Sequence, residues 1–230
     1  MLAIIPARKG SKGLKNKNIK LINKKPLISY TIEAAIKSSK ITEIFISTND
    51  LRVIKIASSY NINTPFLRPN KLATDKSPAI ETYLDSIEKL NMNLKKKYKN
   101  FVVLLPTSPL RSVNDIDKAI EVFQKKKADS VISMSMAHQP IEWHKKISKN
   151  HKVDKNFNSK KSVSNRQNLE KTFVPNGSIY VFNYNFLKNS KNYYGNKTYA
   201  YIMPKIKSYD IDDKIDFEIV KKFLIKKNEK

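Results

Sequence analysis

A short loop near the start of the chain carries the residue types that bind phosphate groups. It reads Arg8-Lys9-Gly10-Ser11-Lys12-Gly13, with Lys17 and Asn18 shortly after it. Glycine lets a backbone turn tightly and approach a ligand closely, and successive backbone N–H groups can form an anion-binding nest. The arginine and lysines add cationic donors, and the serine adds a hydroxyl. In chemical terms this is a loop that binds a triphosphate.

The spacing of the loop differs from two familiar phosphate-binding motifs. No Gly-Lys-Ser/Thr follows Gly10 at the Walker spacing, and the dinucleotide fingerprint is absent. A plainer interpretation, a basic connection between a strand and a helix, stays open for the loop taken alone.

Two aspartates near the end of the chain suit a divalent metal. Asp210 and Asp212 are two residues apart, so on an extended segment both side chains point to one face. Two carboxylates suit Mg²⁺, which also takes substrate phosphates and waters, with Mn²⁺ as the alternative ion. Asp213 and Asp216 are alternative ligands, and Asp212 or Asp213 would also cap a following helix. We favour metal binding at Asp210 and Asp212 and capping at Asp213.

The chain uses arginine sparingly. Lys and Arg total 45 residues, of which only five are arginines. Because the planar arginine fork binds carboxylates and phosphates at two points, the retained arginines indicate specific sites. Arg166 suits a sugar carboxylate, Arg52 is interpreted as a surface or structural ion pair, and Arg111 fits a functional and a structural role equally. The remaining two are Arg8 and Arg68.

The formal net charge of +25 comes mostly from scattered lysines. We interpret it as a solvated lysine surface that helps to attract a polyphosphate by long-range steering. A basic nucleic-acid-binding protein is a remote alternative that rests on the charge alone. The chain lacks a helix-turn-helix signature, an aromatic-rich RNA motif and clustered arginines, so we expect no nucleic-acid partner.

Apolar runs alternate with amphipathic segments along the chain. Strands are expected at 2–7, 44–48, 101–105, 129–134 and 174–182, and helices at 26–39, 51–60, 77–91, 114–125 and 214–227. This order predicts an α/β fold with a mostly parallel sheet covered on both faces. Ligands of such sheets bind outside the carboxyl ends of the strands. The loops at 8–18, 106–111 and 210–213 are therefore the informative ones.

The length of 230 residues predicts a single domain, residues 1–230, with one distinct segment. Residues 138–175 are polar and rich in Lys, Asn and Ser. They are either a disordered insertion or an arm that buries apolar residues against a partner subunit. The apolar residues concerned are Ile141, Trp143, Ile147, Val153 and Phe157.

The remaining features exclude several classes of protein. The three histidines lie at no metal-like spacing and are expected at the surface or in the arm, and the absence of cysteine rules out disulfides. No apolar run approaches the length of a membrane span, and the apolar start is too short for a signal peptide. We expect a cytoplasmic protein with no membrane partner.

Five segments together carry a resemblance. Residues 5–13 with Lys17-Asn18 are similar to the opening motif of the acylneuraminate cytidylyltransferases (CMP-sialic acid synthetases). Four further regions resemble the same family in the same order, so the resemblance covers nearly the whole chain. They are 66–69 with 72–75, 106–111, 165–167 with 175–180, and 209–212. Lys15 and Asn16 depart from the apolar residues or proline that the family often carries there.

The resemblance implies a Rossmann-like, three-layer nucleotidyltransferase fold and a CTP-dependent reaction. CMP is transferred from CTP to the anomeric hydroxyl of a nonulosonic (sialic-acid-type) sugar, and pyrophosphate leaves, with Mg²⁺ as cofactor. A homodimer built partly through the 138–175 arm is also implied. By resemblance the catalytic residues are Arg8, Lys12, Lys17 and Asp212. The implied nucleotide-binding residues are Arg8, Gly10, Ser11, Lys12, Gly13, Lys17, Asn18, Arg68, Ala73, Asp75 and Ser77. The implied sugar-binding residues are Arg166, Gln167, Asn176 and Tyr180, and the metal ligands are Asp210 and Asp212.

One departure concerns the acceptor sugar. Leu105 stands where many family members carry a glutamine that touches the sugar, and leucine cannot form that hydrogen bond. Legionaminic or pseudaminic acid is therefore an alternative acceptor to N-acetylneuraminate. A member of the CMP-Kdo branch should show a different opening loop, and the intact loop and aspartate pair disfavour an inactive homologue.

Overall fold

The computed structural model describes the chain except for residues 11, 155–164, 166, 168, 229 and 230 and the side chains of 226–228. Its centre is a six-stranded sheet with the strand order β4-β1-β5-β7-β6-β8. The bounds are β1 (Leu2–Pro6), β4 (Glu43–Ser47), β5 (Asn100–Leu104), β6 (Ser130–Met136), β7 (Phe173–Asn183) and β8 (Thr198–Ile202). The five strands expected from the sequence are all present, and β8 was not expected.

The sheet is mostly parallel. Strand β1 pairs in parallel with β4 and β5, and β6 pairs in parallel with β8. Strand β7 runs antiparallel between β5 and β6 and joins them. The apolar runs on β1 and β5 fit strands that are buried on both faces. The predicted α/β fold is thereby confirmed.

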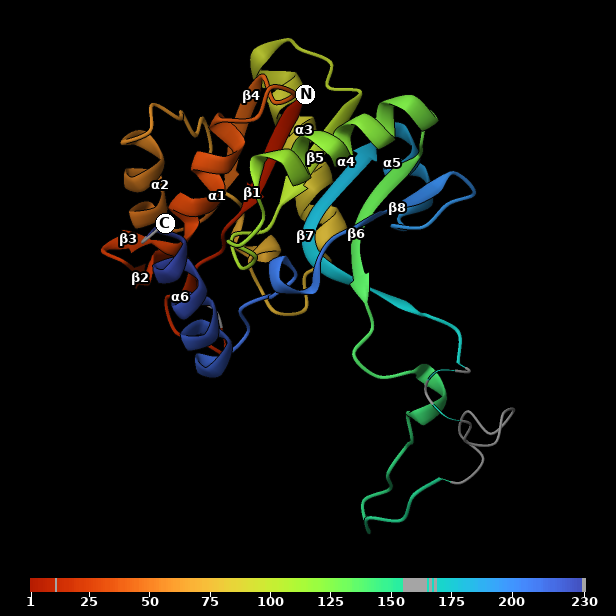
Figure 1. Ribbon diagram of the computed structural model, residues 1–230. Helices are drawn as coiled ribbons and strands as arrows, with labels where there is room; N and C mark the ends of the chain where they lie inside the picture. The colour runs from red at the N-terminus through yellow and green to blue at the C-terminus, as the bar shows by residue number, and fades with distance from the viewer. Residues whose placement is uncertain (11, 155–164, 166, 168, 229–230) are drawn as a thin grey trace.

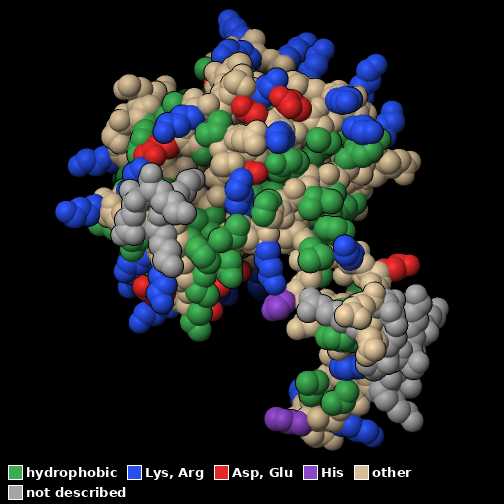
Figure 2. Space-filling view, in the orientation of Figure 1, with side chains coloured by type: hydrophobic (Ala, Val, Ile, Leu, Met, Phe, Trp, Pro, Cys, Tyr) green, Lys and Arg blue, Asp and Glu red, His purple; other side chains and the backbone are tan. Residues whose placement is uncertain are grey.

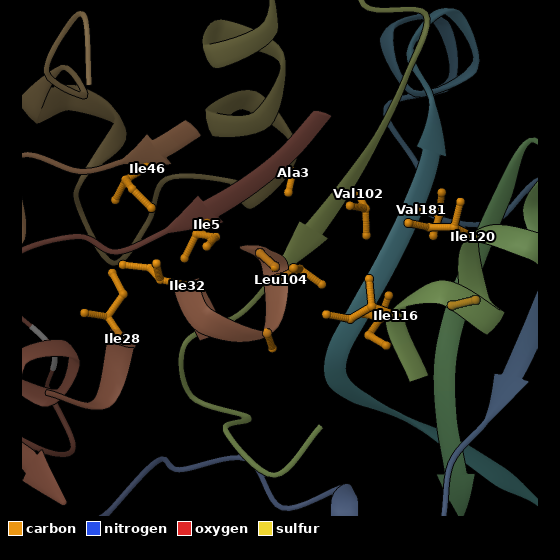
Figure 3. Packing of buried hydrophobic residues seen from close by; sticks show 14 of the residues in the cluster. Ala3, Ile5, Ile28, Ile32, Ile46, Val102, Leu104, Ile116, Ile120 and Val181 are labelled. Carbon is orange, nitrogen blue, oxygen red and sulfur yellow. The ribbon is translucent and has the colours of Figure 1, made fainter. Parts of the chain in front are cut away.

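Helices cover both faces of this sheet (Figure 1). Residues of α1 (Leu27–Ile36), α2 (Leu51–Ser58) and α4 (Val113–Lys126) share one apolar cluster with Ala3 and Ile5 of β1 (Figure 3). Residues of α3 (Ala79–Leu94) and α5 (Tyr184–Ser190) share another with Leu2 and Ile4. Successive side chains of β1 thus enter opposite layers, as the two-residue period of a strand requires.

A third, smaller cluster joins the two ends of the chain. Helix α6 (Lys214–Asn228) contributes Phe217 and Val220, which pack with Leu14 of the opening loop and with Ile22. Ile22 belongs to a short hairpin, β2 (Leu21–Ile22) and β3 (Lys25–Pro26), that the sequence did not reveal. Its turn residues Asn23 and Lys24 both have positive φ, which is the requirement of a two-residue type I′ turn. Neither position is a glycine, the residue that such turns favour.

The segment between β6 and β7 projects from the body of the protein (Figure 1). The two strands continue outward as a ribbon as far as the pair Met136–Phe173, so residues 173–175 of the predicted arm belong to a strand. Further out, Ile147 and Val153 form an isolated antiparallel bridge. Ile141, Trp143, Ile147 and Val153 are exposed, Ile147 by 67%. Phe157 lies outside the described residues.

The surface charge follows the distribution of lysine in the sequence. Figure 2 shows Lys and Arg side chains spread around this face of the molecule rather than gathered in one patch. His138, His144 and His151 are all exposed, as expected. No helix in the described part of the chain is long and apolar enough to cross a membrane.

Asp115 is a buried polar link between α4 and the far edge of the sheet. With Ser112 it forms a capping box at the start of α4. Its carboxylate also accepts hydrogen bonds from Lys207 Nζ (2.9 Å) and from the Tyr201 hydroxyl (3.1 Å). Burial raises the pKa of Asp115, but the bonds from Ser112 and Lys207 outweigh it and leave the pKa below its usual value.

We expect Asp115→Asn to lower the free energy of unfolding at pH 7 by about 2 kcal/mol, since hydrogen bonds to a charged group are lost. The folded-state pKa lies below the unfolded one, so the stabilisation is complete above the unfolded value and is lost as the pH falls through the folded value. Urea unfolding at pH 7 and at about pH 3 should therefore show a difference that shrinks in acid. Glu121→Gln on the same helix, whose ion pair with Lys40 is exposed, is the control and should change stability little. An equal loss at both pH values would contradict the assignment.

Candidate functional site

A cavity of about 550 Å³ lies at the carboxyl ends of β1 and β5. Its walls are the loop after β1, the segment around residues 68–83 and the loop after β5, with Asp212 closing one side. The volume is in the range of ligand-binding pockets. Its position is the one that the sheet topology predicts for a ligand.

The opening loop is held against the end of the chain by a contact that only glycine permits. A Cβ atom on Gly13 would lie 2.2 Å from the backbone oxygen of Asp212. Gly10 has φ +83°, a conformation that glycine adopts at little cost, and open space around it. The loop therefore turns at Gly10 and touches the C-terminal segment at Gly13. Ser11 lies outside the described residues.

Lys17 reinforces the same contact. Its ammonium group donates hydrogen bonds to the backbone oxygen of Ile211 and to Asp212 Oδ1 (3.3 Å). The lysine side chain is only 11% exposed, whereas that of Asp212 is 83% exposed. Asn18 donates to the backbone oxygen of Arg8 (3.2 Å) and so braces the loop from within. Both Lys17 and Asn18 line the cavity.

Arg8 and Lys12 face the cavity from the same loop and share one acidic partner. Arg8 Nη2 lies 2.5 Å and Lys12 Nζ 3.0 Å from the carboxylate of Asp75. Arg8 Nη1 also donates to the backbone oxygen of Ala73 (3.2 Å). Ser77 lines the cavity and donates to the backbone oxygen of Lys71. The structure thus brings seven of the predicted nucleotide-binding residues of segments 8–18 and 73–77 together around one space, whereas Gly10 and Ala73 do not line it. The seven are Arg8, Lys12, Gly13, Lys17, Asn18, Asp75 and Ser77.

Arg68 lines the cavity but is largely a structural residue. Its guanidinium donates to the hydroxyl (3.1 Å) and the backbone oxygen of Ser47 at the end of β4. Burial lowers the pKa of Arg68 to about 10. Because Arg68 Nε and Nη2 donate to Ser47, the arginine acts on a ligand in the cavity mainly through its long-range positive charge.

Arg111 has a structural role, the second of the two that its sequence context allowed. It is buried and donates to the backbone oxygen of Leu105, to Ser178 and to Thr31 Oγ1 (2.8 Å). It thereby ties the loop after β5 to β7 and α1. Burial lowers the pKa of Arg111 to about 9. Arg52 pairs with the buried carboxylate of Asp50 at 2.7 Å, which confirms the predicted ion pair in its structural form.

Of the two predicted metal ligands, Asp212 lines the cavity and Asp210 does not. Asp210 is largely enclosed, with Ser108 Oγ 3.4 Å from Oδ1, whereas Asp212 lines the open space. Burial, and then the charge of Asp212, raise the pKa of Asp210. The charge of the exposed Asp212 therefore adds to the cost of ionising the enclosed Asp210, and a cation bound to these carboxylates would offset that cost.

The described residues contain no cluster of three metal-ligating side chains. Mg²⁺ is often held by one or two carboxylates together with substrate phosphates and waters, so the pair of aspartates fits that use.

The next acidic residues belong to the helix. Asp213 Oδ1 accepts hydrogen bonds from the backbone N–H groups of Ile215 (2.7 Å) and Asp216 (2.9 Å), which confirms its predicted capping role. Asp216 Oδ2 accepts in return from the backbone of Asp212 (3.0 Å) and Asp213. Asp216 is thus engaged in holding the aspartate segment in place.

The three predicted sugar-binding residues that the structure describes do not line this cavity. Asn176 is buried, its amide nitrogen donating to Ser208 Oγ (2.9 Å) and its amide oxygen accepting from Ser133 Oγ (2.6 Å). Tyr180 belongs to an aromatic stack with Phe182, and burial raises its pKa to about 12. Gln167 is exposed in the arm. Arg166 lies outside the described residues.

Sequence reasoning missed the apolar wall of the cavity. Tyr83 and Leu72 line it beside Leu105, and Thr107 adds a polar edge. Tyr83 lies on the buried side of α3, and nothing in its local sequence distinguishes it from a core residue. Thr107 belongs to the 106–111 segment, which is identified by its resemblance to the family although Thr107 itself is not among the predicted site residues.

Comparisons with known proteins place this geometry in a family. The profile of the cytidylyltransferase family matches residues 2–230. The chain is 35% identical over 229 residues to an N-acylneuraminate cytidylyltransferase of Escherichia coli O18:K1:H7, covering 99% of this chain but only 53% of that protein. The chain thus spans about half the length of that relative. It is 34% identical to a CMP-N,N'-diacetyllegionaminic acid synthase of Legionella pneumophila, with 97% of this chain and 96% of that protein covered.

A solved structure supports the fold. The structure of a CMP:2-keto-3-deoxy-manno-octonic acid synthetase complexed with CTP superposes with a TM-score of 0.71 at 14% identity, over 98% of both chains. At this identity the likeness concerns the fold alone, and it agrees with the expected three-layer nucleotidyltransferase architecture. From the family match and the relatives together, the chain belongs to the cytidylyltransferase family, and its resemblance to the acylneuraminate cytidylyltransferases is confirmed.

Proposed function

We propose that the protein is a CTP-dependent nucleotidyltransferase that transfers CMP from CTP to the anomeric hydroxyl of a nonulosonic acid and releases pyrophosphate. The observation that carries the proposal is one cavity lined both by the cationic loop and by Asp212, whose carboxylate accepts a hydrogen bond from Lys17 of that loop. Arg8, Lys12 and Lys17 supply donors for phosphates, and Asp210 and Asp212 supply hard oxygen ligands. Membership of the cytidylyltransferase family supports the choice of CTP.

The reaction is a direct displacement at the α-phosphorus. The anomeric hydroxyl oxygen forms the new bond to phosphorus, and the bond to the oxygen that bridges the α- and β-phosphates breaks. Pyrophosphate leaves with the bonding electrons, and the hydroxyl proton passes to a base or to water. Such chemistry depends on positioning and on charge stabilisation. Arg8, Lys12 and Lys17 hold the negative charge that accumulates on the departing pyrophosphate.

Asp210 and Asp212 are the proposed holders of Mg²⁺, with Mn²⁺ as the alternative ion. When bound, the ion neutralises charge on the phosphates near the reacting phosphorus. The support comes from the chain itself, since burial, and then the charge of Asp212, raise the pKa of Asp210 even though the charge of Lys17 lowers it. Lys17 keeps Asp212 beside the loop through its hydrogen bond.

A second acceptor class is favoured by the cavity wall. Leu105 and Tyr83 present an apolar surface beside the loop after β5. This surface suits a sugar with a deoxy position there better than one with a hydroxyl that requires a hydrogen bond at that place. Legionaminic or pseudaminic acid is therefore an alternative acceptor to N-acetylneuraminate. Arg166 and Gln167 are the proposed partners of the acceptor carboxylate.

We also propose a cytoplasmic homodimer in which the arm packs against a second copy. The exposed apolar side chains Trp143, Ile147 and Val153 support this use, because they lie away from the core of their own chain. The cytoplasmic location follows from the proposed dependence on CTP. The proposed organisation is one cytidylyltransferase domain, residues 1–230, in which residues 138–175 form the dimerisation arm.

Asp212→Asn should lower the rate of pyrophosphate release from CTP and Mg²⁺ by about a hundredfold or more, because a ligand carboxylate is removed. The assay measures pyrophosphate with a panel of nonulosonic acids. Asp213→Asn is the matched control, since asparagine caps a helix as well as aspartate does and the same charge is lost. Equal rates for the two variants would argue against the metal role of Asp212. If no sugar acid promotes release by the unaltered protein, the proposed function is wrong.

Leu105→Gln should change the ranking of acceptors. We expect kcat/KM for legionaminic or pseudaminic acid to fall about tenfold relative to N-acetylneuraminate, because an apolar contact is replaced by a polar group. The measurement is the ratio of kcat/KM values for each pair of acceptors, which cancels general damage to the enzyme. An unchanged ratio would show that Leu105 does not face the acceptor.

Gly13→Ala should reduce activity far more than Gly10→Ala. The added methyl group at Gly13 meets the Asp212 backbone oxygen and pushes the loop away from the aspartates, whereas at Gly10 it enters open space. At Gly10 the positive φ costs only about 1 kcal/mol of stability. Pyrophosphate release and thermal unfolding measured on both variants separate the two effects. A similar drop in activity for both would mean that the contact at Gly13 has no special role.

A further inference from the structure

Asp75 lies where a phosphate would be expected. Its carboxylate contacts Arg8 Nη2 at 2.5 Å and Lys12 Nζ at 3.0 Å, and all three residues line the cavity. These are two of the three cations that the proposed function assigns to the phosphates of CTP. A carboxylate repels a phosphate, so Asp75 cannot help to bind one through these contacts.

The segment that carries Asp75 is ordered by its own hydrogen bonds. Ser77 Oγ donates to the backbone oxygen of Lys71 at 2.7 Å and lies 2.7 Å from Thr74 Oγ1. Arg8 Nη1 donates to the backbone oxygen of Ala73, while Nη2 donates to the Asp75 carboxylate. The hydrogen bonds of residues 71–77 therefore hold Asp75 next to the opening loop. The Arg8 hydrogen bond, and then that of Lys12, lower the pKa of Asp75, so it is an anion at neutral pH.

We infer that Asp75 is an internal substitute for phosphate. In the protein without nucleotide it pairs with Arg8 and Lys12, and the β- and γ-phosphates of the nucleotide displace it. When the reaction is complete, Asp75 pairs with the two cations again and so helps to release pyrophosphate. This inference rests on the proposed function, since it takes the opening loop to be the phosphate site. Small anions meet two cations that are already paired, whereas a triphosphate brings enough charge to displace one carboxylate.

The competition has a distinct thermodynamic signature. Every ligand that uses Arg8 and Lys12 must first displace Asp75, so CTP and pyrophosphate lose affinity by the same factor. CMP lacks the β- and γ-phosphates and does not incur this loss. Removal of the carboxylate should therefore tighten CTP and pyrophosphate together and leave CMP unchanged. A general change in pocket shape would not raise the affinities for CTP and pyrophosphate while leaving the affinity for CMP unchanged.

The test measures dissociation constants of CTP, pyrophosphate and CMP by calorimetry, without sugar and at fixed salt and Mg²⁺. The proteins are the unaltered chain, Asp75→Asn, Asp75→Ala and the control Glu81→Gln. The two ion pairs are partly exposed, so each Asp75 variant should bind CTP and pyrophosphate roughly three- to tenfold more tightly. CMP should change less than twofold. Glu81, an exposed acid in the first turn of α3, removes the same charge without touching the two cations, so its variant should behave as the unaltered chain.

Three results would overturn the inference. Equal CTP and pyrophosphate affinities in the unaltered and Asp75 variants would show that the carboxylate does not compete, with the proposed function intact. Weaker CTP binding by variants that unfold at the normal temperature would make Asp75 a direct contributor to nucleotide binding. If CTP binds to none of the four proteins, the phosphate site itself is wrong and the proposed function falls with the inference.

Discussion

The backbone oxygen of Asp212 lies so close to Gly13 that no side chain fits between them. This contact joins the first loop of the chain to its last irregular segment, and Lys17 adds hydrogen bonds to Ile211 and Asp212 at the same place. Helix α6 supports the junction from behind, through the cluster that contains Leu14 and Phe217. The cavity has a closed wall only because these distant segments meet. Phosphate donors and aspartates are thereby held at one site although about 195 residues separate them.

The charges around the cavity are arranged in two tiers. Arg8 and Lys12 are accessible and pair with Asp75, whereas Arg68 and Arg111 are buried and bound to hydroxyl and backbone oxygens. Among the described residues neither buried arginine forms a salt bridge, so their positive charge is not cancelled by direct contact. Such charges act on an anionic ligand through a protein interior that screens poorly. The rarity of arginine in the chain thus has two explanations, since some of the retained arginines position backbone rather than substrate.

Much of the architecture was predictable because the chain is strongly patterned. Runs such as 2–6 and 101–105 are apolar without interruption, and the opening loop is marked by two of the four glycines. Strand β8 and helix α5 were missed, since both are short and β8 is a half-exposed edge strand with weak alternation. The hairpin at 21–26 was missed because its turn uses Asn23 and Lys24 in place of glycine.

The site was only partly predictable. Residue types identified the phosphate loop and the aspartate pair, because their chemistry is local. The commitment of Asn176 to a buried network depends on Ser133 and Ser208, which are distant in sequence. The same holds for Tyr83, which reaches the cavity only through the packing of α3 on the sheet. Tertiary contacts of this kind leave no mark in a local pattern.

The central position of β7 has a consequence for how the protein is made. Strands β1, β4 and β5 are complete by residue 104, and β6 by residue 136, yet β5 and β6 meet only through β7, which begins at Phe173. During synthesis the inner edge of β5 stays unpaired while about seventy further residues are added, at a rate of roughly 5–20 per second. An open edge of this kind is a template for pairing with other chains. The arm lies between β6 and β7, so a longer arm lengthens the time for which the edge of β5 stays unpaired during synthesis.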